Sequence, residues 1–319
     1  MSEIRAHAVG AAPGKVILFG EHAVVHGRPA IAVALSHGLG VVVRASSATP
    51  KLHIPRWGRA GLVVEAQSDR GSGSDAVTRA FHRALDLVGP KDGTGVDVTI
   101  DGELPLGVGL GSSAAFSVSL IRGLADYSRL SLSDETLRGY AHELESIFHG
   151  NPSGLDHSVI IQNEALRFDP IHKPRFESIQ LGIGLPLVVA WTPRVGTTKD
   201  AVAHVGSLAR AQPELSAQIF DAVASVVDKA TEALRAGSMS ELGDLMNINH
   251  GLLSALGVVS LDNERMVSLA RGAGALGAKV TGAGFGGAVI ALAPGCGEAV
   301  RDRLTEAGYP ALLNFIENQ

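Results

Sequence analysis

The chain contains little cysteine and no long apolar run. Cys296 is the only cysteine among the 319 residues, which excludes an internal disulfide and a metal site built from several cysteines. No stretch approaches the roughly 18 consecutive apolar residues of a membrane-spanning helix. Residues 1–10 also lack the basic flank and apolar segment of a secretory signal. We therefore expect a cytoplasmic protein with no membrane partner.

An excess of basic residues is also missing. The sequence has 27 Lys+Arg against 32 Asp+Glu, a formal net charge of −5, and only 4% aromatic residues. Without a basic run or an aromatic RNA-binding motif, a nucleic-acid groove is not expected, and a nucleotide ligand would have to be bound by local features of the chain. The apolar fraction of 45% is that of an ordinary globular protein. The length predicts one large or two fused domains, and two is our working hypothesis.

Strand-like and helix-like patterns are mixed in the first half of the chain, and from about Lys199 the pattern becomes mainly helical. The predicted strands are residues 14–19, 29–44, 96–101, 158–162, 185–191, 278–281, 288–293 and 309–315. The predicted helices are residues 75–88, 112–128, 134–148, 214–235, 240–256, 263–271 and 298–307. A Gly/Pro-containing stretch at 182–184 marks the best boundary, giving domains 1–181 and 182–319, and residues 59–75 read as a mobile loop.

Glycine is abundant, with 39 residues, and it clusters in three places. The first cluster runs from Pro105 to Ala115 (PLGVGLGSSAA), after a predicted strand and at the start of a predicted helix. Glycines let backbone N–H groups converge on a phosphate, and the helix N-terminus adds unpaired donors. The hydroxyls of Ser112 and Ser113 are candidates to cap the helix or to reach a magnesium ion. The alternative is a tight strand-to-helix turn with a serine cap.

Three common nucleotide-binding motifs do not fit this chain. Ser112 stands where the dinucleotide fingerprint needs a glycine or alanine. A phosphate loop of the GxxxxGK[ST] type is absent around Gly14-Lys15, because Val9 and Val16 occupy the positions of the first glycine and the hydroxyl. A protein kinase is excluded since no HRD or DFG sequence occurs.

The second cluster, Thr281–Gly287 (TGAGFGG), matches GxGxxG in letters only. A dinucleotide-binding loop must be followed by a helix, whereas residues 288–293 (AVIALA) predict a strand. The loop therefore joins two strands. It is either a plain β-turn or a place where the backbone lies against a bound nucleotide or substrate.

The third cluster spans residues 12–27 (APGKVILFGEHAVVHG). Lys15 is a cation inside an apolar strand, which is costly unless the lysine meets an anion or faces the surface. His22 and His26 are four residues apart, but Ala23 stands where the HExxH zinc motif requires glutamate. Orienting hydrogen bonds or simple packing are therefore expected of these histidines rather than metal ligation.

Two carboxylates stand in a chemically suggestive setting. Glu145 lies near the end of a predicted helix, where the helix dipole disfavours a negative charge unless a cation binds it. A turn at residues 151–154 (NPSG) is expected to bring Asp156 back toward that helix end. Phosphoryl transfer needs a magnesium ligand and a group that orients or deprotonates the attacking hydroxyl, and these acids can supply one each. The alternative is a pair of solvated surface carboxylates.

Taken together, these segments resemble the GHMP kinases, a superfamily of ATP-dependent small-molecule kinases, and most closely its mevalonate kinase family. The resemblance covers essentially the whole chain and rests on four segments in order, residues 13–27, 109–115, 149–156 and 249–258. It implies the α+β, two-domain GHMP kinase fold, with an N-terminal domain like domain 2 of ribosomal protein S5 and a ferredoxin-like C-terminal domain. The implied reaction is phosphorylation of (R)-mevalonate by ATP with Mg²⁺, giving 5-phosphomevalonate in the mevalonate pathway of isoprenoid biosynthesis.

The resemblance also implies roles for individual residues. Asp156 matches the catalytic base, and Lys15 matches the cation at the attacking hydroxyl. Ser113 and Glu145 match the magnesium ligands. The phosphates would be held by Pro105, Leu106, Gly107, Val108, Gly109, Leu110, Gly111, Ser112, Ser113 and Ala114. The substrate side would be formed by Glu21, His22, Thr198 and Gly284.

One position departs from the pattern, since Phe285 stands where the family usually has another glycine. The fit of the substrate is therefore open. Two alternatives are another GHMP kinase, acting on phosphomevalonate or a sugar, and a non-catalytic ligand-binding relative. Retention of Lys15, Ser113, Glu145 and Asp156 together argues against the second. The assembly state is left open, with a homodimer as one candidate.

Overall fold

The computed structural model describes residues 7–57, 61–65, 75–91, 93–105, 107–150, 152–172 and 175–318, without the side chains of residues 193–195. Leu106, one of the predicted phosphate-binding residues, lies outside the described residues, as does most of the predicted loop 59–75. No helix in these ranges is long and apolar enough to cross a membrane.

The chain folds into two compact units, and neither is continuous in sequence. The first unit comprises Met1–Gly14, His37–Leu106 and Gly111–Asn163, and the second comprises Lys15–Ser36, Gly107–Leu110 and Glu164–Gln319. Strands β1 (His7–Phe19) and β2 (Ala30–Ser46) therefore each belong partly to one unit and partly to the other. The domain boundary between residues 181 and 182 stays a prediction.

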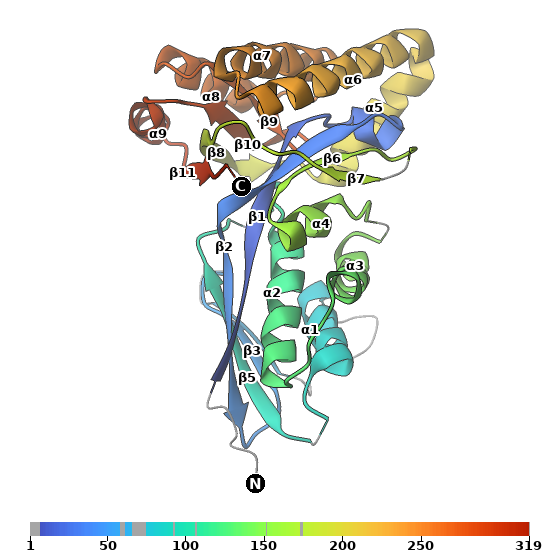
Figure 1. Ribbon diagram of the computed structural model, residues 1–319, viewed down its shortest axis with the longest axis vertical. Coiled ribbons are helices and arrows are strands. Elements are labelled where there is room, and N and C mark those ends of the chain that lie inside the picture. Colours follow the sequence, from blue (N-terminus) through green and yellow to red (C-terminus); the bar gives the residue numbers. More distant parts are fainter. Residues whose placement is uncertain are drawn as a thin grey trace. The chain divides into compact units, whose positions relative to one another are not determined.

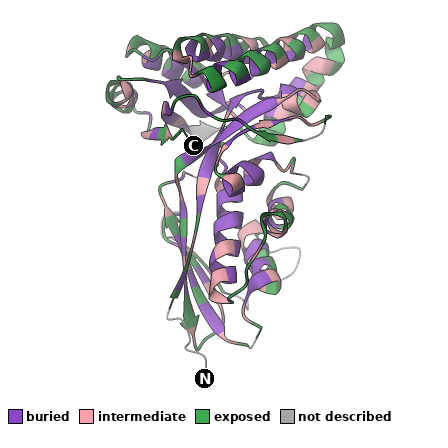
Figure 2. Cartoon of the chain, in the orientation of Figure 1, coloured by how far each residue is buried: buried purple, intermediate pink, exposed green. Residues whose placement is uncertain are grey.

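The first unit places its helices together beside its strands (Figure 1). Its remaining elements are β3 (Lys51–Ile54), β4 (Leu62–Glu65), α1 (Ala76–Val88), β5 (Gly95–Gly102), α2 (Ser112–Tyr127), α3 (Asp134–His149) and α4 (Leu155–Gln162). The second half of β2 pairs antiparallel with β5, and β5 pairs parallel with β3. Helix α2 is buried over most of its length, as Figure 2 shows, and it contacts α1, α3 and α4. This central helix begins within the predicted phosphate-binding segment, residues 105–114, which we call the phosphate loop. The unit's core therefore fixes the end of that loop.

The second unit is built on a four-stranded antiparallel sheet in the order β11-β8-β10-β9. Its elements are η1 (Ala23–His26), β6 (Ala165–Phe168), β7 (Phe176–Ser178), β8 (Leu185–Val195), α5 (Thr198–Ala211), α6 (Pro213–Ala236), α7 (Met239–Ala255), α8 (Leu261–Gly272), β9 (Gly277–Thr281), β10 (Gly286–Leu292), α9 (Gly297–Glu306) and β11 (Ala311–Ile316). Helices α7 and α8 pack on β9 and β10, and every residue of these two strands is buried. The loop between β9 and β10 therefore extends from a rigid core.

Most predicted elements are confirmed, but one predicted strand is part of a helix. Residues 158–162, predicted as a strand, form the second half of helix α4. The apolar run there (SVII) has the β-branched composition of a strand, but residues 157–161 are all buried, so no helical periodicity was visible. The predicted loop 59–75 contains strand β4, and helix α5 was not predicted at all.

Candidate active site

The phosphate loop has the backbone that its glycines predict. Gly107, Gly109 and Gly111 have positive φ angles of 71°, 90° and 73°, a region that side chains other than glycine rarely adopt. Gly111 is the N-cap of α2 and, as a glycine, provides no side-chain cap. Ser112 and Ser113 therefore do not cap α2, which leaves its first-turn N–H groups suited to an anion.

Ser113 and Glu145 come together in the first unit, as predicted for a shared cation. Ser113 Oγ lies 3.3 Å from Glu145 Oε2, and Ser117 Oγ lies 3.4 Å from Glu145 Oε1. Glu145 is only 2% exposed, so its carboxylate is largely withdrawn from water. His149, to which no role was assigned from the sequence, places Nε2 at 2.9 Å from Ser113 Oγ. The site is thus a buried carboxylate surrounded by hydroxyls and one exposed imidazole.

Asp156 lies in the first turn of α4, two residues after the N-cap Gly154, which has the left-handed conformation. The dipole of a helix favours a negative charge at this end. The neighbouring His157 is buried, and burial, together with His142 and Arg138, lowers its pKa to about 4 despite the opposing effect of Asp156. His157 is therefore neutral near pH 7 and adds no positive charge beside Asp156.

Lys15 is buried in β1, with 4% of its surface exposed, and it does not face solvent. Its backbone N–H donates to the carbonyl of Leu110 at 3.0 Å. Its ammonium Nζ donates to the carbonyl of Gly109 at 3.4 Å. The second unit therefore brings this lysine to the first part of the predicted phosphate loop, Gly107–Leu110. Its contact with an anion stays a prediction.

His22 contacts the loop between β9 and β10 through its ring. The residue has an unusual positive φ of 60°, and its Nε2 lies 2.8 Å from the carbonyl oxygen of Ala283. A carbonyl accepts hydrogen bonds, so Nε2 carries the proton. Burial lowers the pKa of His22, and the bond to Ala283 opposes that shift only in part. The imidazole is thus a neutral, oriented group.

Glu21 is 1% exposed and is held by two buried partners that the sequence analysis missed. Lys279 Nζ donates to Glu21 Oε1, and Asn249 Nδ2 donates to Glu21 Oε2 at 3.0 Å. A lysine inside the apolar run 278–281 was the available signal for the first of these contacts. His26 packs its ring on Phe220, with centroids 4.3 Å apart. No group of three or more metal-ligating side chains occurs in the described ranges.

The TGAGFGG segment joins β9 to β10, as predicted, and it lies against the backbone of Val258, which follows helix α7. Phe285 has a φ of 56°, and its N–H donates to the Val258 carbonyl at 2.7 Å. Gly284 is buried, and a Cβ there would lie 2.3 Å from the same carbonyl oxygen. Thr198 is exposed at the start of α5, where the side chain of Thr197 forms the N-cap. Contacts of Gly284 and Thr198 with a substrate stay predictions.

Comparison with known proteins identifies the family. Residues 75–163 match the family model "GHMP kinases N terminal domain", and residues 230–310 match "GHMP kinases C terminal". The mevalonate kinase of Pyrococcus horikoshii is 38% identical over 331 aligned positions, which cover 98% of this chain and 96% of that protein. The chain belongs to the mevalonate kinase family.

Solved structures of mevalonate kinases also share its fold. The L. major mevalonate kinase, solved in complex with R-mevalonate, is 29% identical, has a TM-score of 0.85 and covers 100% of this chain and 99% of its own. The Methanococcus jannaschii mevalonate kinase is 25% identical, with a TM-score of 0.82 over 98% of this chain and 99% of its own. The α+β, two-domain GHMP kinase fold expected from the sequence is thereby confirmed.

In this mevalonate kinase family member, Phe285→Gly is expected to change the KM for one substrate by less than about tenfold and to leave kcat largely unchanged. A tenfold change in KM corresponds to about 1.4 kcal/mol of free energy. Glycine accepts the φ of 56° without strain. The change removes only a ring whose centroid lies 5.4 Å from that of His204. Steady-state kinetics with each substrate varied in turn will measure this effect, with Phe285→Leu as a control that keeps an apolar side chain. A folded Phe285→Gly variant that loses kcat by orders of magnitude would assign the ring a further role.

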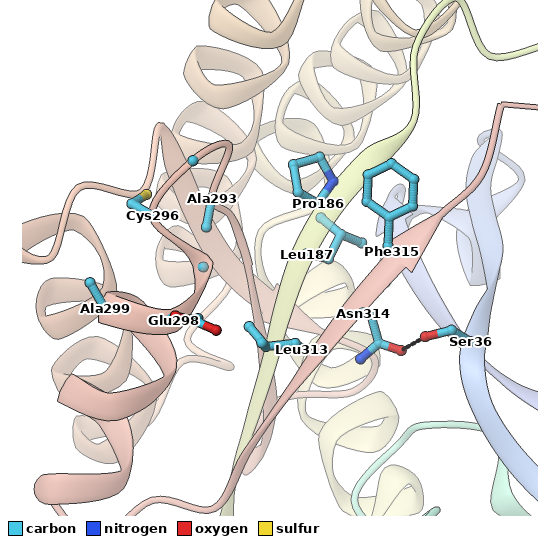
Figure 3. A pocket seen from close by; sticks show the side chains of 12 residues that line it. Ser36, Pro186, Leu187, Ala293, Cys296, Glu298, Ala299, Leu313, Asn314 and Phe315 are labelled. Atoms are coloured by element: carbon cyan, nitrogen blue, oxygen red, sulfur yellow. Dashed lines mark hydrogen bonds between the residues drawn. The ribbon is translucent and has the colours of Figure 1, made fainter.

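A separate hollow of about 700 Å³ lies in the second unit of this family member. Figure 3 shows Asn314 and Ser36 at its wall, joined by a 3.1 Å hydrogen bond from Ser36 Oγ to Asn314 Oδ1. None of the predicted site residues lines it. It is therefore distinct from the groups that the family assigns to catalysis.

Proposed function

We propose that this protein transfers the γ-phosphoryl group of ATP to the primary hydroxyl of (R)-mevalonate, giving 5-phosphomevalonate and ADP. The observation that carries the proposal is the identity of 38% to a mevalonate kinase over 98% of the chain. The similarity extends through both GHMP kinase regions, residues 75–163 and 230–310. We further propose a cytoplasmic location, in keeping with a single cysteine.

Magnesium fits the residues of the first unit. Mg²⁺ prefers a small number of carboxylate or hydroxyl oxygens and completes its shell with water and phosphate oxygens. The Glu145 carboxylate is buried and lies 3.3 Å from Ser113 Oγ, so an anionic and a neutral oxygen ligand are already together. We propose that these two residues hold the ion. When bound, it would neutralise negative charge on the phosphates.

The phosphates of ATP are proposed to lie along Gly107–Ala114. The positive φ angles of Gly107, Gly109 and Gly111 turn the backbone there. The start of α2 carries no side-chain cap, so its first-turn N–H groups are suited to hold an anion. Lys15, buried and 3.4 Å from the Gly109 carbonyl, adds a cation to this loop. Preorganised donors of this kind act where negative charge develops in phosphoryl transfer.

Asp156 is proposed to orient the attacking hydroxyl and to accept its proton. A carboxylate accepts hydrogen bonds, and Asp156 lies in the first turn of α4, the end of the helix at which backbone N–H groups are unpaired within the helix. The neutral His157 beside it adds no positive charge there. Lys15 is proposed to stabilise the negative charge that grows on the attacking oxygen.

The substrate side is proposed to involve Glu21, His22, Thr198 and Gly284. The structure supports His22 most directly, because its neutral ring is fixed against the Ala283 carbonyl at 2.8 Å. Glu21 accepts hydrogen bonds from Lys279 and Asn249 on its two oxygens. We therefore propose that Glu21 acts mainly by fixing the geometry of this region.

Acceptor choice tests the function. In an assay of ADP release, mevalonate is expected to be the best acceptor, with phosphomevalonate, galactose and homoserine far poorer in kcat/KM. The Ser113→Ala variant serves as a background control, because it keeps the fold and lacks one proposed magnesium ligand. Equal or better turnover of one of the other three acceptors would remove the mevalonate assignment and leave a GHMP kinase of different specificity.

A further inference from the structure

Three alternate residues of β9 and the loop after it contact the segment that carries Lys15 and His22. Lys279 Nζ donates to Glu21. Thr281 Oγ1 accepts from the N–H of Ile17 at 3.1 Å and donates to its carbonyl at 2.9 Å. The carbonyl of Ala283 accepts from His22. Side chains two residues apart lie on one face of a strand, so Lys279 and Thr281 face this segment from β9. The backbone carbonyl of Ala283, in the loop after β9, extends this row of polar contacts.

The contact between Lys279 and Glu21 is the most buried of the row. Lys279 is 0% exposed and Glu21 1% exposed. Lys279 also donates to the carbonyl of Val280 at 2.7 Å, while Asn249 from α7 donates to the second carboxylate oxygen at 3.0 Å. Burial lowers the pKa of Lys279, and the neighbouring Glu21 carboxylate opposes that shift. Such a pair is costly to desolvate, and an apolar pair often replaces it without loss of stability.

A buried ion pair that adds little stability can still fix one geometry. Glu21 is the residue before His22, whose positive φ of 60° is strained for a side chain other than glycine. Such a conformation persists only where its surroundings enforce it. The carboxylate of Glu21, held on both oxygens, anchors the turn on one side of His22, and the Ala283 carbonyl anchors its ring on the other.

We propose that Lys279 is a positioning residue for the acceptor alcohol: its ammonium fixes Glu21, and Glu21 fixes the turn that presents His22. This inference rests on the proposed function, since it assigns the acceptor side of the site to His22. Lys279 acts through Glu21, because the hydrogen bonds of its ammonium to Glu21 and Val280 are directed at protein atoms.

Kinetics of Lys279→Met separate positioning from a purely structural role. We expect the KM for the acceptor to rise at least tenfold, while the KM for ATP changes less than threefold. A purely structural role would reduce only the folded fraction, which lowers apparent kcat and leaves both KM values unchanged. Leu304→Ala is the matched control, because Leu304 is 1% exposed in the apolar core of the same unit, on α9. It should lower the melting temperature and leave both KM values at the wild-type level.

Two further variants keep the test decisive if Lys279→Met does not fold. Glu21→Gln keeps the shape of the side chain, and Glu21→Gln with Lys279→Met removes both charges at once. Each folded variant should show the raised acceptor KM, and the double variant should be no worse than the more impaired single one, since both changes act through one carboxylate. Wild-type acceptor KM in any folded variant that lacks the pair would overturn the proposal.

A measurement on the free protein distinguishes this inference from the proposed function. The pKa of His22, lowered by burial in the wild type, is expected to move back toward 6.5 in Lys279→Met when the turn loosens. An NMR titration of the imidazole signals, assigned with His22→Gln, detects this shift without any substrate. An unchanged His22 titration in Lys279→Met would overturn the positioning role, whereas failure of mevalonate as acceptor in the wild type would overturn only the function.

Discussion

Replacing Asp156 by asparagine is expected to lower kcat with mevalonate by roughly 10²–10⁴, the usual contribution of a general base. The amide keeps the shape of the side chain in the first turn of α4, so the helix should be retained. It cannot accept a proton. Asp156 is also the neighbour that raises the pKa of His157, so its replacement leaves this buried histidine neutral near pH 7. Chemistry should therefore be lost while the fold survives.

Steady-state kinetics and calorimetry together check this result for Asp156→Asn. Binding of ATP with magnesium should remain near the wild-type value. Asp134→Asn, in the first turn of α3, is a control for the effect of removing a carboxylate from a helix start. A kcat of Asp156→Asn close to that of the wild type would show that another group activates the hydroxyl.

Replacing Glu145 by glutamine is expected to weaken magnesium binding and to lower kcat at ordinary magnesium concentrations, with partial recovery when magnesium is raised. A neutral amide is a poorer ligand than a carboxylate for a hard dication. The substituted side chain would remain beside Ser113 and Ser117, whose hydroxyls lie 3.3 and 3.4 Å from the two carboxylate oxygens. The defect should thus be one of metal affinity.

The dependence of kcat on magnesium concentration separates the two carboxylates. Glu145→Gln should recover in part, whereas Asp156→Asn should not. Lys15→Met should behave like Asp156→Asn, because its proposed role is to stabilise charge on the attacking oxygen. Equal recovery of Glu145→Gln and Asp156→Asn would mean that the roles assigned to these two acids are wrong.

The fold was predictable where a segment has one apolar face. Helix α1 begins at Ala76 and ends at Val88, as its periodicity and its N-cap Asp75 indicate. Helix α4 has buried residues on all sides, so its β-branched run read as a strand. The short strands β3, β4, β6 and β7 were missed, since segments of three or four residues carry too little pattern.

The sequence indicated candidate site residues where several of them lie close together along the chain. The glycines of the predicted phosphate loop have the positive φ angles that their residue type allows, and Lys15 donates to the Gly109 carbonyl of that loop. That these residues form an anion site stays a prediction. The buried partners of Glu21 were missed, because Asn249 and Lys279 are 228 and 258 residues away from it. A pairing over such a distance has no local pattern, and only the folded chain reveals it.

The separation between Glu21 and Lys279 also has a consequence for how the protein is made. A ribosome adds about 5–20 residues per second, so 258 residues take roughly 13–52 s. During that time Glu21, whose carboxylate is buried in the folded second unit, does not yet have Lys279 to pair with. The first unit ends at Asn163 and has all of its residues much earlier. We therefore expect the first unit to form during translation. The segment Lys15–Ser36 should stay unfolded, in contact with water or a chaperone, until strand β9 with Lys279 has been synthesised.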